Sequence, residues 1–182
     1  FTASIQSSLA AALPGDIIGI PDNGSFRIGD TVSVREELHY VGIPSFSPEH
    51  FRFINNADPL KSKQLNKGID QLMDEGVAQL FTLKQNNRKI IGTVGALQYE
   101  VIQYRLEHEY NAKCSYEMFP AFKACWIESF DDDQLREFSS LKQRYLAEDK
   151  FGRLVFLADS KFSLQMAQDK FDKITFHLKS EF

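Results

Sequence analysis

Apolar residues between positions 49 and 129 follow two alternating spacings, one of two residues and one of three to four. Strand-like alternation occurs at residues 51–54, 79–84, 89–94, 115–119 and 124–128. Helical spacing occurs between these strands, over residues 98–110 and over an earlier segment with one apolar face. That earlier face consists of Leu65, Ile69, Leu72 and Met73.

The order strand, helix, strand, strand, helix, strand is typical of a ferredoxin-like arrangement, in which two helices cover one face of an antiparallel sheet. We assign residues 46–129 to this core. Its first helix has clear boundary signals: Asp58 is suited to cap free amides, and Pro59 fits the first helical position. Gly76 is suited to end the helix because it adopts the left-handed conformation without strain.

Residues 130–182 predict a C-terminal extension in the order helix, strand, helix, strand. Three acidic residues, Asp131–Asp133, suit a helix N-terminus, and Ser160 is suited to cap the second helix. The first helix would carry one apolar stripe, made of Leu135, Phe138, Leu141 and Tyr145. Residues 148–150 are interpreted as a solvated loop, and no internal repeat is close enough to indicate duplication.

The first 45 residues are interpreted as a β-rich end of a barrel followed by a linker. A turn signal at residues 21–24 lies between two short apolar runs, and such a ribbon needs other strands to pack on. Two prolines and two serines within residues 42–48 favour an extended connection. The fold class predicted is therefore α+β: a partial β-barrel remnant at 1–45, then an α/β domain at 46–182.

Composition limits the classes of function. The chain has 182 residues, 43% hydrophobic and 25% charged, and 21 Lys and Arg against 25 Asp and Glu give a net charge of −4. A wholly cationic surface is excluded, so we expect no stable DNA binding, and any RNA contact must be local. Apolar runs are too short to cross a membrane and no signal peptide opens the chain, so a cytoplasmic protein is expected.

The residues indicate no catalytic centre and no metal site. Cys114 and Cys125 are interpreted as packed apolar groups, and the four histidines lack ligand spacing. Consecutive carboxylates at Asp131–Asp133 point in different directions, which favours capping over a divalent cation. The glycine pair of residues 92–95 could expose amides to an anion, or could serve only a tight turn and close packing of a helix on the sheet.

Five basic residues are the candidates for a local interaction patch. Lys61, Lys63 and Lys67 lie at the start of the first helix, and Arg88 and Lys89 open a strand of the hairpin. Lysines near a helix N-terminus are disfavoured by the helix dipole, which argues that something else keeps them there. Two readings remain open: ordinary solvation, and recognition of a polyanion.

Several short motifs carry a resemblance to translational GTPases. PGDIIG at residues 14–19 and IGDT at 28–31 resemble closing strands of the second-domain barrel of these proteins. GTVGALQ at residues 92–98 resembles the third-domain signature of the elongation-factor-G-like subfamily, where His often replaces Gln98. The further matches are GIP at 42–44, DPLK at 58–61, KQL at 63–65 and DEG at 74–76. Together these segments are most similar to the bacterial peptide-chain release factor three family.

The resemblance implies a role in translation termination. Members are ribosome-dependent GTPases that promote the departure of class-one release factors from the ribosome, and they hold GTP and magnesium in an N-terminal domain. That domain has no counterpart in these residues, so the fragment itself is expected to be neither an enzyme nor a nucleotide binder. The third domain packs against the GTPase domain and approaches the small ribosomal subunit, which gives Lys61, Lys63 and Lys67 a partner.

Two alternatives are kept. One is a ferredoxin-like regulatory domain that binds a small molecule at the turn of residues 92–95. The other is the equivalent domain of an elongation-factor-G-like GTPase. The chain starts with Phe1 rather than Met, and we expect it to be a piece of a longer protein.

Overall fold

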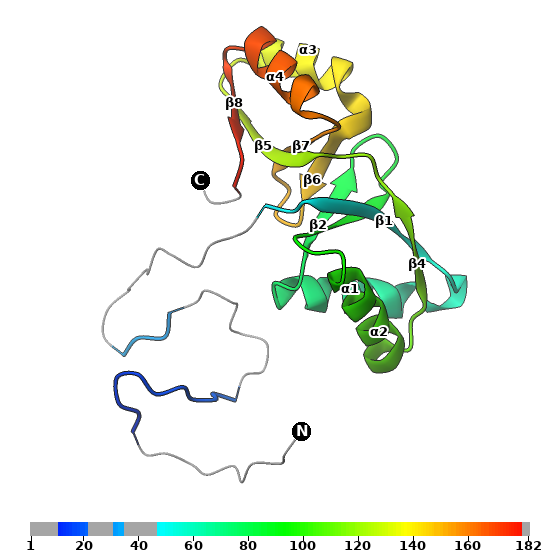
Figure 1. The fold of residues 1–182 in the computed structure, drawn as a ribbon, viewed down its shortest axis with the longest axis vertical. Helices are drawn as coiled ribbons and strands as arrows, with labels where there is room; N and C mark the ends of the chain where they lie inside the picture. The colour runs from blue at the N-terminus through cyan, green and yellow to red at the C-terminus, as the bar shows by residue number, and fades with distance from the viewer. Residues whose placement is uncertain (1–10, 22–30, 35–46, 180–182) are drawn as a thin grey trace.

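A computed structural model describes residues 11–21, 31–34 and 47–179 (Figure 1). Residues 11–21 and 31–34 are exposed and contain no strand, with one turn at Pro14 and Gly15. The turn signal at 22–24 and the motif at 28–30 lie outside the described residues. The barrel remnant predicted for residues 1–45 therefore stays a prediction.

From residue 50 onward the chain is an α+β fold built on one antiparallel sheet, which confirms the predicted class. In chain order the elements are β1 (His50–Asn56), α1 (Ser62–Asp74), β2 (Gln79–Leu83), β3 (Lys89–Thr93), α2 (Gln98–Tyr110), β4 (Cys114–Met118), β5 (Lys123–Ser129), α3 (Asp132–Leu141), β6 (Leu146–Asp149), β7 (Leu154–Ala158), α4 (Lys161–Lys170) and β8 (Ile174–His177). The eight strands are ordered β4-β1-β3-β2-β6-β7-β5-β8.

The sheet consists of two halves with the same topology. β1 to β4 with α1 and α2 repeat the element order of β5 to β8 with α3 and α4, and the strand order of the second half mirrors that of the first. The halves join where β2 pairs antiparallel with β6, with Phe81 opposite Asp149 and Leu83 opposite Ala147. The structure thus shows a duplicated topology that the sequence analysis did not detect.

The two halves bury three apolar layers. Because side chains alternate across a strand, each half-sheet presents one face to its own helices and the other face to the opposite half. Phe81 and Trp126 meet in the middle layer with ring centroids 6.2 Å apart. The outer layers lie under α1 and α2 and under α3 and α4. Figure 1 shows these helix pairs at opposite ends with the strands between them.

The predicted capping residues are confirmed in both halves. Asp58 accepts a hydrogen bond from the Leu60 amide at the start of a short 3₁₀ helix, Pro59–Lys61, that leads into α1. Gly76 follows α1 with a φ of 69°, in the left-handed region that glycine adopts without strain. The carboxylate of Asp131 and the hydroxyl of Ser160 cap α3 and α4. Local capping chemistry therefore fixes where these helices begin and end.

The interpretation of residues 148–150 as a solvated loop was wrong, and so was the helix-strand-helix-strand order of the extension. Strand β6 contains Glu148 and Asp149 and pairs with both β2 and β7. Asp149 can be buried because Nε1 of Trp126 and Nε of Arg153 donate to it at 2.9 and 2.8 Å. Tyr145 lies beyond the end of α3, in a 3₁₀ helix, and not on the helix stripe.

Strand β5 belongs to the second half of the sheet, although it follows the first four strands directly in the chain. It was grouped with the first four strands at 46–129, but it pairs with β7 and β8. The last strand of the first half is β4, an edge strand whose pairing partner is β1. The domain limits at 45/46 and 129/130 remain predictions.

Candidate interaction surface

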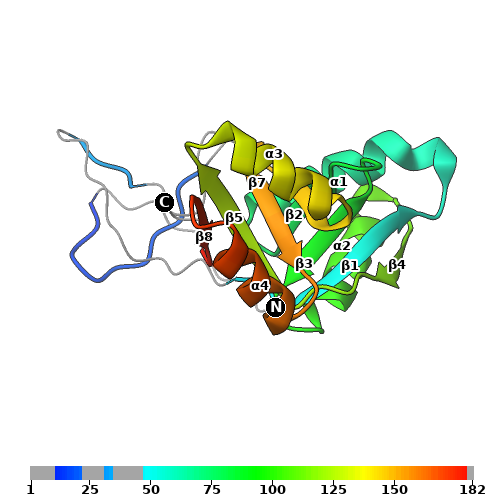
Figure 2. The ribbon, with the colours of Figure 1, turned by 90° about the horizontal axis from the view of Figure 1, so that it is seen from above.

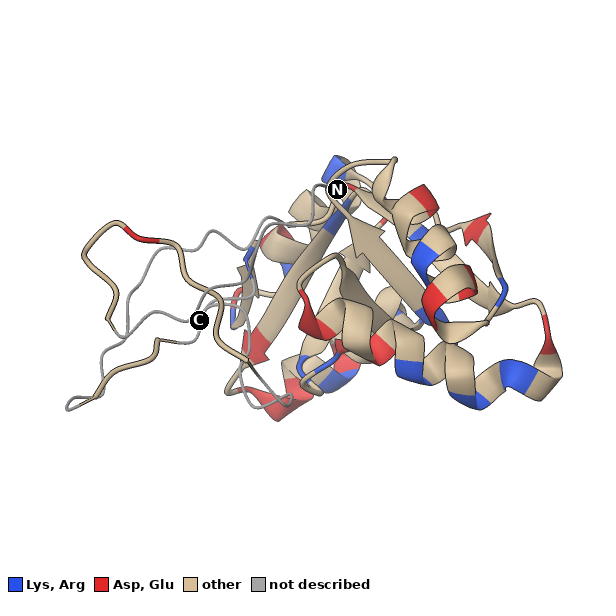
Figure 3. Ribbon diagram, turned by 90° about the horizontal axis from the view of Figure 1, so that it is seen from below, with Lys and Arg blue, Asp and Glu red and all other residues tan. Residues whose placement is uncertain are grey.

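The start of α1 presents lysines to the outside of the helix pair. Leu65, Ile69 and Leu72 of α1 are buried, and Lys63 and Lys67 lie on the opposite side of the helix, where they are exposed (Figure 3). No acidic residue occupies the first turn of this helix. The dipole at this N-terminus is thus faced by positive charge, an arrangement that lowers helix stability.

Two further lysines lie in neighbouring elements; one contacts α1 and the other contacts the end of α2. Nζ of Lys89, at the start of β3, donates to Oδ1 of Asn66 on α1 at 2.9 Å. Nζ of Lys61 donates to Oδ1 of Asn111, the residue after α2, at 2.8 Å. An amide oxygen satisfies a donor without neutralising it, so both ammonium groups keep their charge. We call Lys61, Lys63, Lys67 and Lys89 the α1 lysine cluster.

Leu60 lies within this cluster and is 93% exposed. It precedes Lys61 in the 3₁₀ helix that leads into α1. Acidic side chains occur farther along the helix: Asp74, at the C-terminal end, forms an ion pair with Lys150. The first half of α1 therefore combines positive charge with one exposed apolar side chain, and the second half is mixed in charge.

Arg88 is not brought together with the lysines. Its guanidinium lies 3.5 Å from the centroid of the Phe53 ring, which belongs to the middle layer, and it forms an ion pair with Glu117 on β4. Hydrogen bonding from Arg88 holds the pKa of the Glu117 carboxyl below its usual value. Because neighbouring residues of a strand point to opposite faces, Arg88 and Lys89 serve different surfaces.

The glycine turn of residues 92–95 offers no open amides. The backbone N–H groups of Val94 and Gly95 both donate to Oε1 of Gln98 at 2.9 Å, and Nε2 of the same side chain donates to the Val77 carbonyl at 3.0 Å. Gly92 serves packing, since a Cβ there would lie 2.8 Å from the Phe81 ring. These contacts count against anion or small-molecule binding at this turn.

Gln98 is a structural residue that the sequence analysis singled out without assigning a role. Its side chain reaches back from the first turn of α2 to the preceding amides, as Glu or Gln does in a capping box. The signal available in the sequence was its position three residues after Gly95. This side chain links the end of β3, the start of α2 and the turn after α1.

The described residues show neither a cluster of metal-ligating side chains nor a thiol with a lowered pKa. Within residues 11–21, 31–34 and 47–179 no three His, Cys, Asp or Glu side chains gather into a metal-binding group. Burial raises the pKa of the Cys114 thiol and raises that of Cys125 to about 12, so both thiols stay protonated. None of the helices described is long and apolar enough to cross a membrane.

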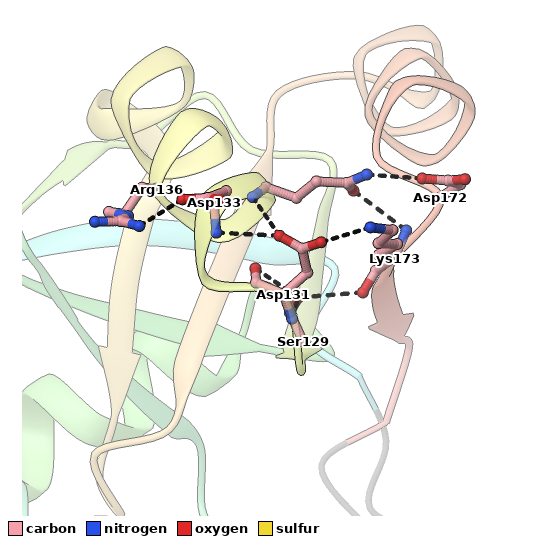
Figure 4. A network of polar contacts seen from close by, with 7 residues as sticks. Ser129, Asp131, Asp133, Arg136, Asp172 and Lys173 are labelled. Carbon is pink, nitrogen blue, oxygen red and sulfur yellow. Dashed lines mark hydrogen bonds and ion pairs between the residues drawn. The ribbon is translucent and has the colours of Figure 1, made fainter.

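A polar network fixes the N-terminus of α3 to the segment before β8 (Figure 4). Oδ1 of Asp131 accepts hydrogen bonds from the amides of Asp133 and Gln134, and Oδ2 accepts from Nζ of Lys173 at 2.7 Å. Hydrogen bonding from Lys173, followed by that of the Gln134 amide, lowers the pKa of the Asp131 carboxyl. The prediction that these carboxylates cap a helix is thereby confirmed for Asp131.

Residues 40–168 match the family model described as class II release factor RF3, C-terminal domain. The matched segment spans both halves of the sheet up to α4 and includes the whole α1 lysine cluster.

Proposed function

Because the chain belongs to the family of the class II release factor RF3 C-terminal domain, we propose that it is the ribosome-docking and coupling module of a GTPase that acts in translation termination. The parent protein would work in the cytoplasm and promote the release and recycling of class-one release factors. GTP and magnesium would bind in the parent's GTPase domain. At the glycine turn of this chain the amides of Val94 and Gly95 donate to Oε1 of Gln98, which leaves these two amides no free proton for a phosphate.

The α1 lysine cluster is the observation that carries the docking proposal. Four lysines from three elements lie on, just before or beside the first half of α1, although the whole chain has a net charge of −4. A local cluster of lysines can bind the phosphates of a nucleic acid even when the net charge of the whole protein is negative. Leu60 adds an exposed apolar contact beside the charges. Ribosomal RNA of the small subunit is the phosphate backbone that a module with the proposed role would meet.

We also infer that the module couples nucleotide state to ribosome binding. α1 and α2 pack together in one layer, with Gly68 of α1 against Leu106 and Tyr110 of α2. A change in how this layer contacts the GTPase domain would shift the population of ribosome-bound states. In this proposal each half of the sheet is a ferredoxin-like unit, and residues 1–45 complete the barrel of the preceding domain.

The test uses the intact factor and its association with small ribosomal subunits. The double variant Lys63→Glu/Lys67→Glu reverses two exposed charges of the cluster, and Lys161→Glu/Lys179→Glu reverses two exposed charges elsewhere. We expect the first variant to weaken binding by roughly tenfold at low salt. The slope of log K against the logarithm of salt concentration should become shallower by about one unit for each lost phosphate contact. Equal binding by the two variants would mean that these lysines are ordinary solvated residues and do not contact the ribosome.

A further inference from the structure

Helix α2 has a second apolar face that points away from the core. Tyr99, Ile102 and Leu106 are buried against the sheet and α1. On the opposite side Leu97, Val101 and Tyr104 are 73%, 51% and 62% exposed. With His108 they follow the spacing of one helical row, and we call these four residues the α2 row. A helix that needs to bury only one face has no reason to keep this second one apolar.

The two aromatic side chains at the outer end of the α2 row contact each other. The rings of Tyr104 and His108 stack with centroids 3.9 Å apart, and Nδ1 of His108 donates to the Tyr104 carbonyl at 2.8 Å. The row extends for about 16 Å, at 1.5 Å per residue of helix. It is one residue wide, a ridge of the kind that packs into the groove of a second helix lying alongside. A preformed aromatic surface also loses less conformational entropy on binding.

Acidic side chains border the α2 row. Glu100 and Glu107 lie on one side of it, and Glu107 forms an exposed ion pair with Lys113 at 3.3 Å, so Glu100 is the carboxylate there whose charge no ion pair within the described residues balances. On the other side Arg105 is held by Glu75 and Glu109, so its charge is already balanced. This border disfavours the phosphates of RNA and of anionic lipid. It also disfavours a second copy of this chain, which would bring the same acidic border against itself.

From these observations we propose that the α2 row is the docking site for a basic amphipathic helix of a protein partner. The partner helix places apolar residues at i, i+4 and i+7 on the row and Lys or Arg beside Glu100 and Glu107. The proposal goes beyond the role in termination, and its evidence is the α2 row, not the α1 lysine cluster.

Helix α4 provides an internal control. Phe162 and Met166 are exposed at the positions that correspond to Leu97 and Val101, but the next outward position is Asp169 where α2 has Tyr104. α4 therefore shows two apolar residues without the continued row. If any exposed apolar side chains were enough for binding, a partner helix would bind α4 as well as α2, whereas the proposal requires binding at α2 alone.

The probe is a fluorescein-labelled synthetic helical peptide with Leu at i, i+4, i+7 and i+11 and Lys on both flanks. A second peptide has the same composition with its leucines dispersed around the helix. Fluorescence anisotropy with the 182-residue chain should show saturable binding of the first peptide alone. Val101→Ser/Tyr104→Ser should weaken binding at least tenfold, and Phe162→Ser/Met166→Ser should leave it unchanged.

Circular dichroism verifies that both double variants stay folded, as expected for exposed positions. Glu100→Lys/Glu107→Lys should weaken binding of the peptide at low salt and remove most of the salt dependence of this binding. The proposal is overturned if the dispersed peptide binds equally well or if the α4 variant loses as much affinity as the α2 variant. Dimerisation of the chain through the α2 row, seen by sedimentation, overturns it too, and so does binding of the row to phosphatidylserine vesicles.

Discussion

Gly68 on α1 lies directly against Leu106 on α2: a Cβ at position 68 would be 2.7 Å from Cδ2 of Leu106. The same Cβ would lie 2.8 Å from Cγ of Tyr110. Only a residue without a side chain permits α1 and α2 to approach this closely. The helix layer that carries both the α1 lysine cluster and the α2 row is therefore held together at a point where glycine is required.

Gly68→Ala is expected to destabilise the chain by about 1–2 kcal/mol. Ala gains up to about 1 kcal/mol over Gly in a helix, but overpacking a tight contact costs typically about 1–3 kcal/mol, and the Tyr110 ring has little freedom to retreat. Urea unfolding measures the difference. Gly95→Ala is the matched control, since a Cβ there meets nothing within 4 Å. A Gly68→Ala protein as stable as the wild type would show that the helices are not packed this closely.

Gln98→Ala removes the acceptor shared by two backbone amides. Water can replace part of this interaction because the side chain is only half-buried, so the expected loss is about 0.5–2 kcal/mol, the usual range for a helix cap. Hydrogen exchange should accelerate at the amides of Val94 and Gly95. Gln71→Ala, the same change at an exposed position of α1, should leave exchange at these amides as it was.

Phe138→Ala is expected to cost about 3–5 kcal/mol, the range for removing a fully buried aromatic ring. The Phe138 ring has edge contacts with Phe156, Phe171 and Phe176 at centroid distances of 5.3, 5.3 and 5.6 Å. The loss should appear as a lower unfolding midpoint. Phe162→Ala, on the exposed side of α4, should change the free energy of unfolding by no more than about 0.5 kcal/mol.

Most elements could be predicted from the sequence because amphipathic spacing and capping residues are local. Strand β6 could not, because Glu148 and Asp149 look solvated until Trp126 and Arg153 are known to contact Asp149. The duplication escaped detection for a related reason. The buried positions of Tyr99, Ile102 and Leu106 correspond to Leu164 and Ala167 of α4 and to Phe171, which follows it, so the spacing is repeated while the residue types are not.

The candidate surface was predicted in part. The lysines of α1 were found by their spacing, and the period of two in a strand could have separated Arg88 from Lys89. The contact of Lys89 with Asn66 depends on how β3 packs beside α1, which no local pattern encodes. The α2 row lies opposite the buried stripe, where helical spacing places Leu97, Val101 and His108 together but does not separate a docking face from scattered exposed residues.

The ion pair of Asp131 with Lys173 predicts a pH-dependent contribution to stability. The folded state lowers the pKa of Asp131, so its ionised form stabilises the fold above the unfolded pKa of about 3.9. That contribution is lost as the pH falls through the lower, folded-state pKa. The stability difference between the wild type and Asp131→Asn should be full at pH 6 and shrink below about pH 4. Asp132→Asn, which changes a carboxylate outside this network, should not reproduce this profile.

Site-specific crosslinking tests the central claim, that the start of α1 docks on the ribosome, most directly. A photoreactive benzoylphenylalanine replaces Leu60 beside the lysines in one intact factor and Phe162 on α4 in another; both native side chains are exposed. After irradiation with ribosomes, the probe at position 60 should crosslink to the small subunit, and the one at 162 should give far less of that product. Small-subunit crosslinks from 162 alone, with none from 60, would contradict the account.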